Sequence, residues 1–381
     1  MDQRMGKNKR DLRFDSLRGL MLVSMTVNHL PSRLRILSDE SIGLFSSAEG
    51  FVFISGLLAG WVYTQKLRRD GPDALMEACR RRATMIYRWQ VAAFLACFAV
   101  VRLTCIFFGF CSQNSPQLFY QSPWLSMLLG VTMLHQPGLL DILPMYCALV
   151  AALPFVLRAL DAGRHLWVIG ISFALWLVAQ WAPPMDTISF YPVNIGAFNL
   201  FAWQFLFFLG VIAGHARLSV SAPVIRPRIL VMAGALGVAV YCFGIQHFGW
   251  RPPWADRYFG VAINKPALGS LRLASFVVVA YFVALAGIRY PKLLSWPALA
   301  FLGRHSIAVV AAQSVVAMFL LQFPGLFASP VSDAIVTAAS IGFLFIAAIA
   351  HEAWQVREAR SESGMRTRRS PNPAARLNPA S

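Results

Sequence analysis

The first long apolar segment of the chain, residues 14–31, contains three ionisable side chains, Asp15, Arg18 and His29. On a helix, the eleven residues from Arg18 to His29 make about three turns, so both side chains lie on one face, about 16 Å apart along the axis. Asp15 lies on this face as well. Ionisable groups in a membrane segment are costly and indicate a functional site. His29 could accept a proton from a hydroxyl near neutral pH, and Arg18 could bind an anion.

A second candidate group begins at residue 47, in the sequence S-A-E-G-F-V-F-I-S-G-L-L-A-G. Glu49, Gly56 and Gly60 share one face of a helix, because steps of seven and eleven residues come within about 20° of whole turns. Gly56 and Gly60 form a GxxxG pattern, which lets two helices approach closely. Glu49 is therefore expected to face a neighbouring helix, and the nearest one in sequence ends at His29. A carboxylate at that place would fix the tautomer of the imidazole.

Residues 134–146 add a third group near the same expected membrane boundary, comprising His135, Asp141 and Tyr146. Together with His29 and Glu49, these side chains could form a buried imidazole–carboxylate site that faces the outside. Basic residues on the opposite side could hold the phosphates of a ligand. They are Arg80, Arg81, Arg82, Arg304 and His305.

Each candidate residue also has a structural interpretation. His29 could donate a hydrogen bond between helices, and Asp15 could neutralise Arg18. Glu49 could mark the start of a helix, and Asp141 could be an N-cap. The arginines at 80–82 could serve only to orient the protein in the membrane.

The elements that must position these residues are membrane helices. The chain has 381 residues, of which 57% are hydrophobic and 13% charged, about half the charged fraction of a typical soluble domain. Apolar runs of spanning length recur along it. The sequence therefore predicts an all-α fold, a polytopic transmembrane bundle of about ten spans. They lie at about 14–31, 47–65, 86–108, 138–158, 166–182, 199–214, 228–247, 268–287, 300–322 and 333–353.

The formal net charge of +17 is distributed unevenly along the chain. Lysines and arginines gather at the two ends and in alternate loops, as the positive-inside rule expects, so both termini are predicted to be cytoplasmic. The same distribution argues against nucleic-acid binding. The six cysteines show no metal-ligand spacing, and no metal site is predicted.

Two domains follow from the pattern of apolar and polar segments. Residues 1–355 form the transmembrane domain, with the first apolar segment kept as a helix because no signal-peptide cleavage site follows it. Residues 356–381 are predicted to be a disordered, basic cytoplasmic tail. Residues 111–137 contain an apolar run that is too short to span and is expected to be interfacial or re-entrant. No internal repeat is present.

Five stretches of the chain resemble the OpgC-type family of membrane acyltransferases, relatives of the acyltransferase-3 group. They are D-S-L-R-G-L-M-L-V-S-M-T-V-N-H (15–29), S-A-E-G-F-V-F-I-S-G (47–56), L-D-I-L-P-M-Y (140–146), F-N-L-F-A-W-Q-F-L-F-F-L-G (198–210) and L-G-R-H-S-I-A-V-V (302–310). Their order along most of the chain is more specific than the Arg–His pair alone. The resemblance implies transfer of an acyl group from a cytoplasmic thioester to a sugar hydroxyl outside, in the bacterial inner membrane.

The named example of the family type succinylates osmoregulated periplasmic glucans. The resemblance makes His29 the catalytic base and Arg18 the second residue of the family's hallmark pair. Acyl-CoA is then a co-substrate, with no tightly bound cofactor, and glucan and membrane lipid are the other partners. The reasoning from residue types and the resemblance together assign residues to three roles: His29, Glu49 and Asp141 to catalysis; Arg18, Arg80, Arg81, Arg82, Arg304 and His305 to the donor; Asp15, His135, Tyr146, Trp203 and Gln204 to the substrate.

Two alternatives remain open at the level of sequence. Arginine and histidine within a membrane segment also mark the path of a transporter, here for an anionic metabolite or an acylated glycan. An enzyme of the same fold could instead use acetyl-CoA or act on another surface polysaccharide.

Overall fold

The computed structural model describes residues 11–109, 116–181, 192–218, 228–250 and 256–369, and this part of the chain is helical, without any strand. The all-α prediction is confirmed. The longer helices are α1 (Leu12–His29), α2 (Ser47–Phe108), α5 (Ile142–Asp161), α6 (His165–Trp181), α8 (Leu200–Ala216), α9 (Ile229–Phe248), α11 (Ser270–Arg289), α13 (Ser306–Leu320) and α14 (Pro330–Arg369). The shorter ones are α3 (Leu118–Gln121), α4 (Pro123–Val131), α10 (Asp256–Ala262) and α12 (Pro297–Arg304), with 3-10 turns η1 (Arg33–Leu37), η3 (Pro291–Leu294) and η4 (Pro324–Phe327).

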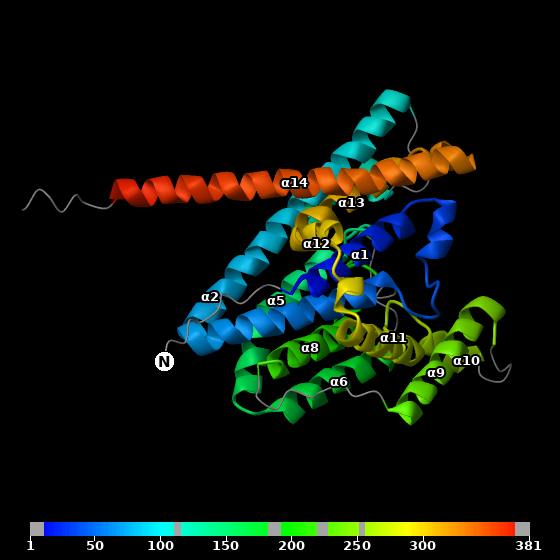
Figure 1. The fold of residues 1–381 in the computed structure, drawn as a ribbon. Coiled ribbons are helices and arrows are strands. Elements are labelled where there is room, and N and C mark those ends of the chain that lie inside the picture. Colours follow the sequence, from blue (N-terminus) through cyan, green and yellow to red (C-terminus); the bar gives the residue numbers. More distant parts are fainter. Residues whose placement is uncertain (1–10, 110–115, 182–191, 219–227, 251–255, 370–381) are drawn as a thin grey trace, which may run out of the picture.

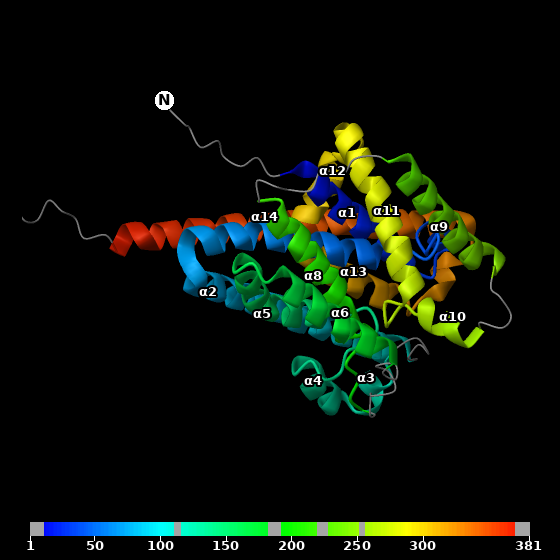
Figure 2. The same ribbon diagram turned by 90° about the horizontal axis from the view of Figure 1, so that it is seen from below.

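Helix α2 folds back on itself. Gly71 has φ 86° and ψ 175°, which are not helical angles, and Pro72 follows it without a backbone donor. The chain therefore reverses within α2, and its two arms diverge from a bend at one end of the molecule (Figures 1 and 2). The arms contain the predicted spans 47–65 and 86–108. The expected loop at 66–88 is helical instead, apart from this bend.

Fewer helices than predicted are long and apolar enough to cross a membrane. Five helices among the described residues qualify, namely α2, α5, α9, α11 and α14, and a sixth does if α12 and α13 form one span bent by 88°. Helices α6 and α8 are apolar but shorter, and α2 counts once although it has two arms. Helix α1 does not count among them, because its 18 residues include the three charged residues Arg13, Asp15 and Arg18. The prediction of about ten spans is not confirmed.

Large apolar side chains cover the outer surface of the bundle. Leu166, Trp181 and Leu230 are each more than 80% exposed. A surface of this kind is costly in water and is typical of a protein that faces lipid. Together with the apolar helices, it identifies a membrane protein.

Glycines bring α2 and α8 into direct backbone contact. A Cβ atom at Gly60 would lie 2.2 Å from the carbonyl oxygen of Val211, and one at Gly214 would lie 2.0 Å from that of Leu57. The GxxxG pattern of α2 thus faces α8. The expectation that this face meets the first helix is wrong, because α1 contacts α2 elsewhere, through a 2.6 Å hydrogen bond between Ser24 and Ser47.

A second close contact joins α1 to α12. A Cβ atom at Gly19 would lie 1.8 Å from the carbonyl oxygen of Leu299, and one at Gly303 would lie 1.9 Å from that of Asp15. Only glycine permits backbones to approach so closely. Arg18 is therefore held beside the break between α12 and α13.

Two segments near the ends of the predicted domains differ from expectation. Helix α14 continues to Arg369 and extends past the rest of the bundle (Figure 1), so the boundary at residue 355 is not a helix end. The expectation of disorder from residue 356 is corrected for residues 356–369, and residues 370–381 lie outside the described residues. The expected interfacial piece contains α3 and α4, both too short to span, while its residues 111–115 are likewise not described.

Candidate functional site

A cavity of about 430 Å³ lies inside the bundle between α1, α2, α5, α8 and α13. Along α2 its lining runs from Phe51 to Gln65, about 21 Å of helix. Its volume is in the range of small-molecule sites. The polar lining residues are Asp11, Arg18, Ser55, Tyr63, Gln65, Arg82, Tyr146 and Ser306. The rest of the lining is mostly apolar, so the cavity suits a ligand that is partly apolar and partly charged.

Arg18 enters this cavity from α1. Its guanidinium donates a hydrogen bond to the hydroxyl of Ser306 and lies over the ring of Phe51, 5.6 Å from the ring centre. Ser306 is the first residue of α13, directly after the bend from α12. The bend between α12 and α13 therefore positions the hydroxyl that binds Arg18.

Tyr146 and Arg82 are two further predicted residues that line the cavity. The Tyr146 hydroxyl donates to the backbone carbonyl of Phe51 at 3.3 Å. Arg82 is half-buried, and no carboxylate contacts it among the described residues. Arg80 and Arg81 differ from it, since both are exposed and both pair with Glu77 outside the cavity. The expected cluster of three arginines is thus divided, with one member facing the ligand space.

Asp11 is the single carboxylate among the described lining residues. It caps the start of α1 and pairs with Arg13 and Arg217 at 2.7 and 3.1 Å. The hydrogen bond from the Arg13 side chain holds the pKa of Asp11 at about 2. Its charge is thus neutralised by its own partners, and the other two charged side chains among the described lining residues are the cations Arg18 and Arg82.

His29 lies at the far end of α1 and does not line the cavity. Its Nδ1 is buried, and neither that atom nor the ring has a carboxylate partner among the described residues. Leu22 and Met25 lie between Arg18 and His29 on the same face of α1, and both are buried in the core. The shared helical face is therefore present, but the buried side chains of Leu22 and Met25 lie between the cavity lining and the imidazole.

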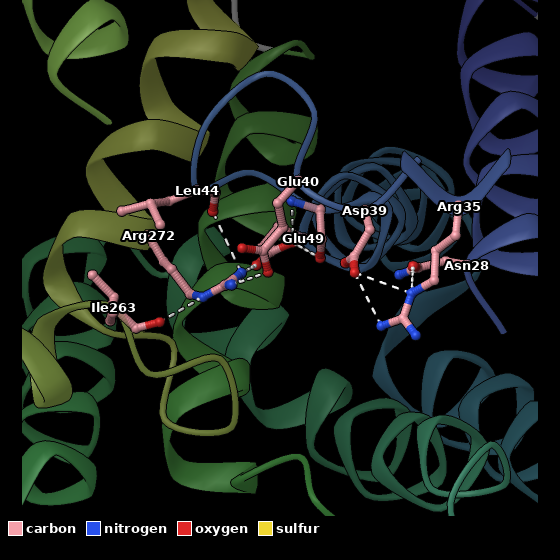
Figure 3. A network of polar contacts seen from close by, with 9 residues as sticks. Asn28, Arg35, Asp39, Glu40, Leu44, Glu49, Ile263 and Arg272 are labelled. Atoms are coloured by element: carbon pink, nitrogen blue, oxygen red, sulfur yellow. Dashed lines mark hydrogen bonds and ion pairs between the residues drawn. The ribbon is translucent and has the colours of Figure 1, made fainter. Parts of the chain in front are cut away.

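Glu49 belongs to a separate buried network (Figure 3). One carboxylate oxygen accepts a hydrogen bond from Arg272 of α11 at 2.9 Å, and the other accepts from the backbone N–H of Ser46 at 3.0 Å in a capping box. Arg272 also pairs with Glu40 and donates to the carbonyl of Ile263 at 2.9 Å. The expectation that Glu49 orients His29 is therefore corrected, because the capping box and the ion pair occupy its carboxylate.

His135 and Asp141 are close in sequence but do not contact one another. Asp141 accepts a hydrogen bond from the Ala197 N–H at 3.0 Å. The Nδ1 of His135 lies 3.1 Å from the carbonyl of Pro192. No hydrogen bond joins either residue to His29 in the described part of the chain. The predicted imidazole–carboxylate site is not assembled here.

The remaining predicted residues hold helices together. Trp203 donates to the carbonyl of Pro266 at 3.0 Å, and Gln204 donates to that of Ser172 at 2.8 Å. His305 is buried with its Nδ1 3.1 Å from that of His351, whereas Arg304 is exposed over the ring of Phe301. Asp15 is buried at the contact with α12. None of these five predicted residues (Asp15, Trp203, Gln204, Arg304 and His305) lines the cavity.

Several residues of the site were not predicted from the sequence. Ser306 and Tyr63 line the cavity, and Arg272 is the centre of the network around Glu49. A signal existed for two of them: Ser306 follows directly after the matched residues Arg304 and His305, and Arg272 is a lone cation in an apolar run. Tyr63 gave no signal, because its position is one of many on an apolar helix.

The comparison with protein families decides the affiliation. A model of the family described as OpgC protein matches residues 10–357, which is most of the chain. The chain belongs to the OpgC protein family. The match extends from α1 into α14, so the cavity and the network around Glu49 lie within the family region. The resemblance inferred from the five stretches is confirmed for the OpgC family. No curated protein and no solved structure matches the chain.

Proposed function

We propose that this OpgC-family membrane protein is an O-acyltransferase. It moves an acyl group, succinyl in the first instance, from cytoplasmic acyl-CoA to hydroxyls of a periplasmic glucan. The observation that supports this proposal is the positively charged, largely apolar cavity into which Arg18 and Arg82 project. Such a cavity fits a donor that has an anionic part and a long flexible arm.

The orientation in the membrane is part of the proposal. The start of α1, the bend of α2 and the end of α14 face the cytoplasm, and the protein spans the inner membrane several times. Charge distribution supports this orientation. Cys105 near the end of α2 is disulfide-bonded, which supports placing that end on the oxidising, periplasmic side.

The donor passes Arg18, Tyr146 and Ser306 in the cavity, and its thioester end reaches inward to meet His29. Two guanidinium groups in an apolar surrounding attract an anion more strongly than they would in water. The exposed Arg80 and Arg81 pair with Glu77 and need not take part in donor binding.

His29 is the base that accepts the proton from the sugar hydroxyl. The sugar oxygen forms a bond to the thioester carbonyl carbon, the carbon–sulfur bond breaks, and the thiolate of coenzyme A takes up the proton. Because Leu22 and Met25 are buried between the cavity and His29, this step requires their side chains to move aside. The arrangement described above is then the resting state.

Replacement of His29 tests the proposal. His29→Ala should abolish acylation of periplasmic glucans in cells while the protein still accumulates in the membrane, because proton transfer of this kind typically contributes about 10² to 10⁴ in rate. The matched control is His247→Ala, which removes an exposed histidine of α9. Acyl content near the normal level in the His29 variant would refute the mechanism.

The transporter hypothesis is tested with the purified protein. In liposomes, a transporter moves its anionic substrate without a thioester donor, whereas the acyltransferase releases free thiol only when donor and glucan are both present. Mass spectrometry of periplasmic glucans and surface polysaccharides, with and without the gene, then identifies the acyl group and the acceptor. If the gene-dependent groups were acetyl groups on another polysaccharide, the protein would be an acetyltransferase of the same fold and the assignment to succinyl transfer onto glucan would be wrong.

A further inference from the structure

A second hollow of the molecule lies outside the cavity described above. The end of α11, the turn η3 and the start of α12 form an open groove of about 890 Å³. Its lining includes two cations, Arg289 and Lys292, and two aromatic residues, Tyr290 and Trp296. No aspartate or glutamate is among the described lining residues. The groove therefore has the charge to bind an anion.

The aromatic rings of the groove are available to a ligand. Tyr290 and Trp296 are 59% and 57% exposed. The Trp296 ring is nevertheless fixed, because its indole N–H donates to the carbonyl of Leu293 at 2.7 Å. The Arg289 guanidinium lies 5.4 Å from the centre of the Tyr290 ring. No ion pair joins Arg289 or Lys292 to a carboxylate within the described residues, and exposed rings beside such cations are the combination that stacks on a nucleobase and binds phosphate.

Hydrogen bonds hold this groove against the first turns of α1. Ser16 accepts from the backbone N–H of Trp296 at 2.9 Å and donates to its carbonyl at 3.0 Å. Arg13 donates to the carbonyl of Gly287 at 2.7 Å. Arg18, which lies in the cavity, is only two residues beyond Ser16. The groove is thus on the side of the molecule where α1 begins.

Helix α12 links the groove to the cavity. It begins at Pro297 in the groove wall and has eight residues, about 12 Å of helix, before the bend that leads to Ser306. The flexible arm of coenzyme A, many bonds long, is suited to a separation of this size. One ligand could therefore occupy both hollows at once.

We propose that the groove binds the adenosine 3′-phosphate 5′-diphosphate end of the acyl-CoA donor. Arg289 and Lys292 hold phosphates, Trp296 stacks on the base, and the pantetheine arm runs along α12 into the cavity. This inference rests on the proposed function, which supplies the donor. It assigns the phosphates to a groove without carboxylates, in place of the arginines at 80 and 81 that Glu77 already neutralises.

The test uses the full-length protein in phosphatidylcholine nanodiscs and two probes, coenzyme A and adenosine 3′,5′-bisphosphate. Calorimetry should show that Arg289→Ala/Lys292→Ala weakens binding of both probes at least tenfold, and that Trp296→Leu weakens it several-fold. The matched control is Arg158→Ala/Arg164→Ala, which removes two exposed cations from the α5–α6 connection. Unfolding temperatures within a few degrees of the parent show that the variants are folded.

Each other outcome overturns the inference. If the parent binds coenzyme A and the groove variants bind it equally well, the groove is not the nucleotide site, while the proposed function stands. If the parent binds neither probe, the donor assignment fails together with the groove. If the groove variants bind both probes as the parent does but interact less with phosphatidylglycerol when it is included in the nanodiscs, the groove binds a lipid headgroup and the nucleotide assignment is wrong.

Discussion

Arg18 reaches the cavity from α1 and donates a hydrogen bond to Ser306, the residue that follows the bend between α12 and α13. A hydrogen bond to a charged group contributes about 1.5–3 kcal/mol, more than one between neutral groups. The Ser306 hydroxyl therefore helps to position the Arg18 guanidinium where the proposed acyl donor binds.

Removal of this hydroxyl should weaken donor binding. Ser306→Ala removes one hydrogen bond that positions the Arg18 guanidinium, and we expect about tenfold lower affinity for acyl-CoA, with a larger loss in Arg18→Ala. Calorimetry on the purified protein measures this, and Ser332→Ala, at the half-buried start of α14 and not among the cavity residues, is the control. Unchanged affinity in Ser306→Ala would show that the bond does not position the cation.

The network of Arg272 with Glu40 and Glu49 makes a prediction about stability. Arg272→Met leaves two carboxylates buried without their cation, which typically costs about 3–5 kcal/mol. The unfolding temperature in detergent should therefore fall strongly for Arg272→Met. It should fall less for Glu49→Gln, because the capping box remains. If Glu49→Gln abolished acylation without any loss of stability, the carboxylate would act in the reaction after all.

At the scale of elements, the packing of α2 on α8 depends on glycines without room for a methyl group. Gly60→Ala should destabilise the protein by about 1–3 kcal/mol, because the added Cβ overlaps the Val211 carbonyl. Gly234→Ala is the control, since Gly234 has open space on α9 and gains about 0.5–1 kcal/mol from its better helix propensity. Comparing unfolding temperatures of the two variants checks the contact. Equal effects would contradict it.

The elements themselves could be predicted from the sequence because each is an apolar run of characteristic length. All ten predicted segments contain helices, and residues 300–322 contain the bent pair α12 and α13. The partners of each helix could not be predicted, since periodicity gives a face but not its neighbour. The face with Gly56 and Gly60 meets α8, which lies about 150 residues further along the chain.

The same limit applies to the site. Arg18, Arg82 and Tyr146 were predicted and line the cavity, whereas Trp203 and Gln204 were predicted from a matched stretch and join helices instead. A matched motif indicates residues that are typical of the family, but it does not distinguish those that pack helices together from those that bind a ligand. Glu49 was placed near His29 in sequence, but its cation comes from Arg272, whose distance along the chain hides the pair.

At the scale of the whole molecule, the orientation of the helices can be tested directly. Fusions of a fluorescent protein after residue 369 should be bright, and fusions of alkaline phosphatase after residue 250 should be active, because the first point is predicted to be cytoplasmic and the second periplasmic. Fusions after residues 70 and 164 should behave as the first kind. An active phosphatase at residue 369 would give an odd number of spans and reverse the predicted place of the C-terminus.

Leu22 and Met25 close the space between the cavity and the opposite end of α1. A chamber that is open to one compartment and closed toward the other exchanges substrate without joining the two aqueous phases. On the proposed orientation, we expect Leu22 and Met25 to keep ions and hydrated protons from crossing the protein while the donor enters and leaves, so that the electrochemical gradient across the bilayer is preserved. The two apolar side chains would thus separate the two aqueous phases.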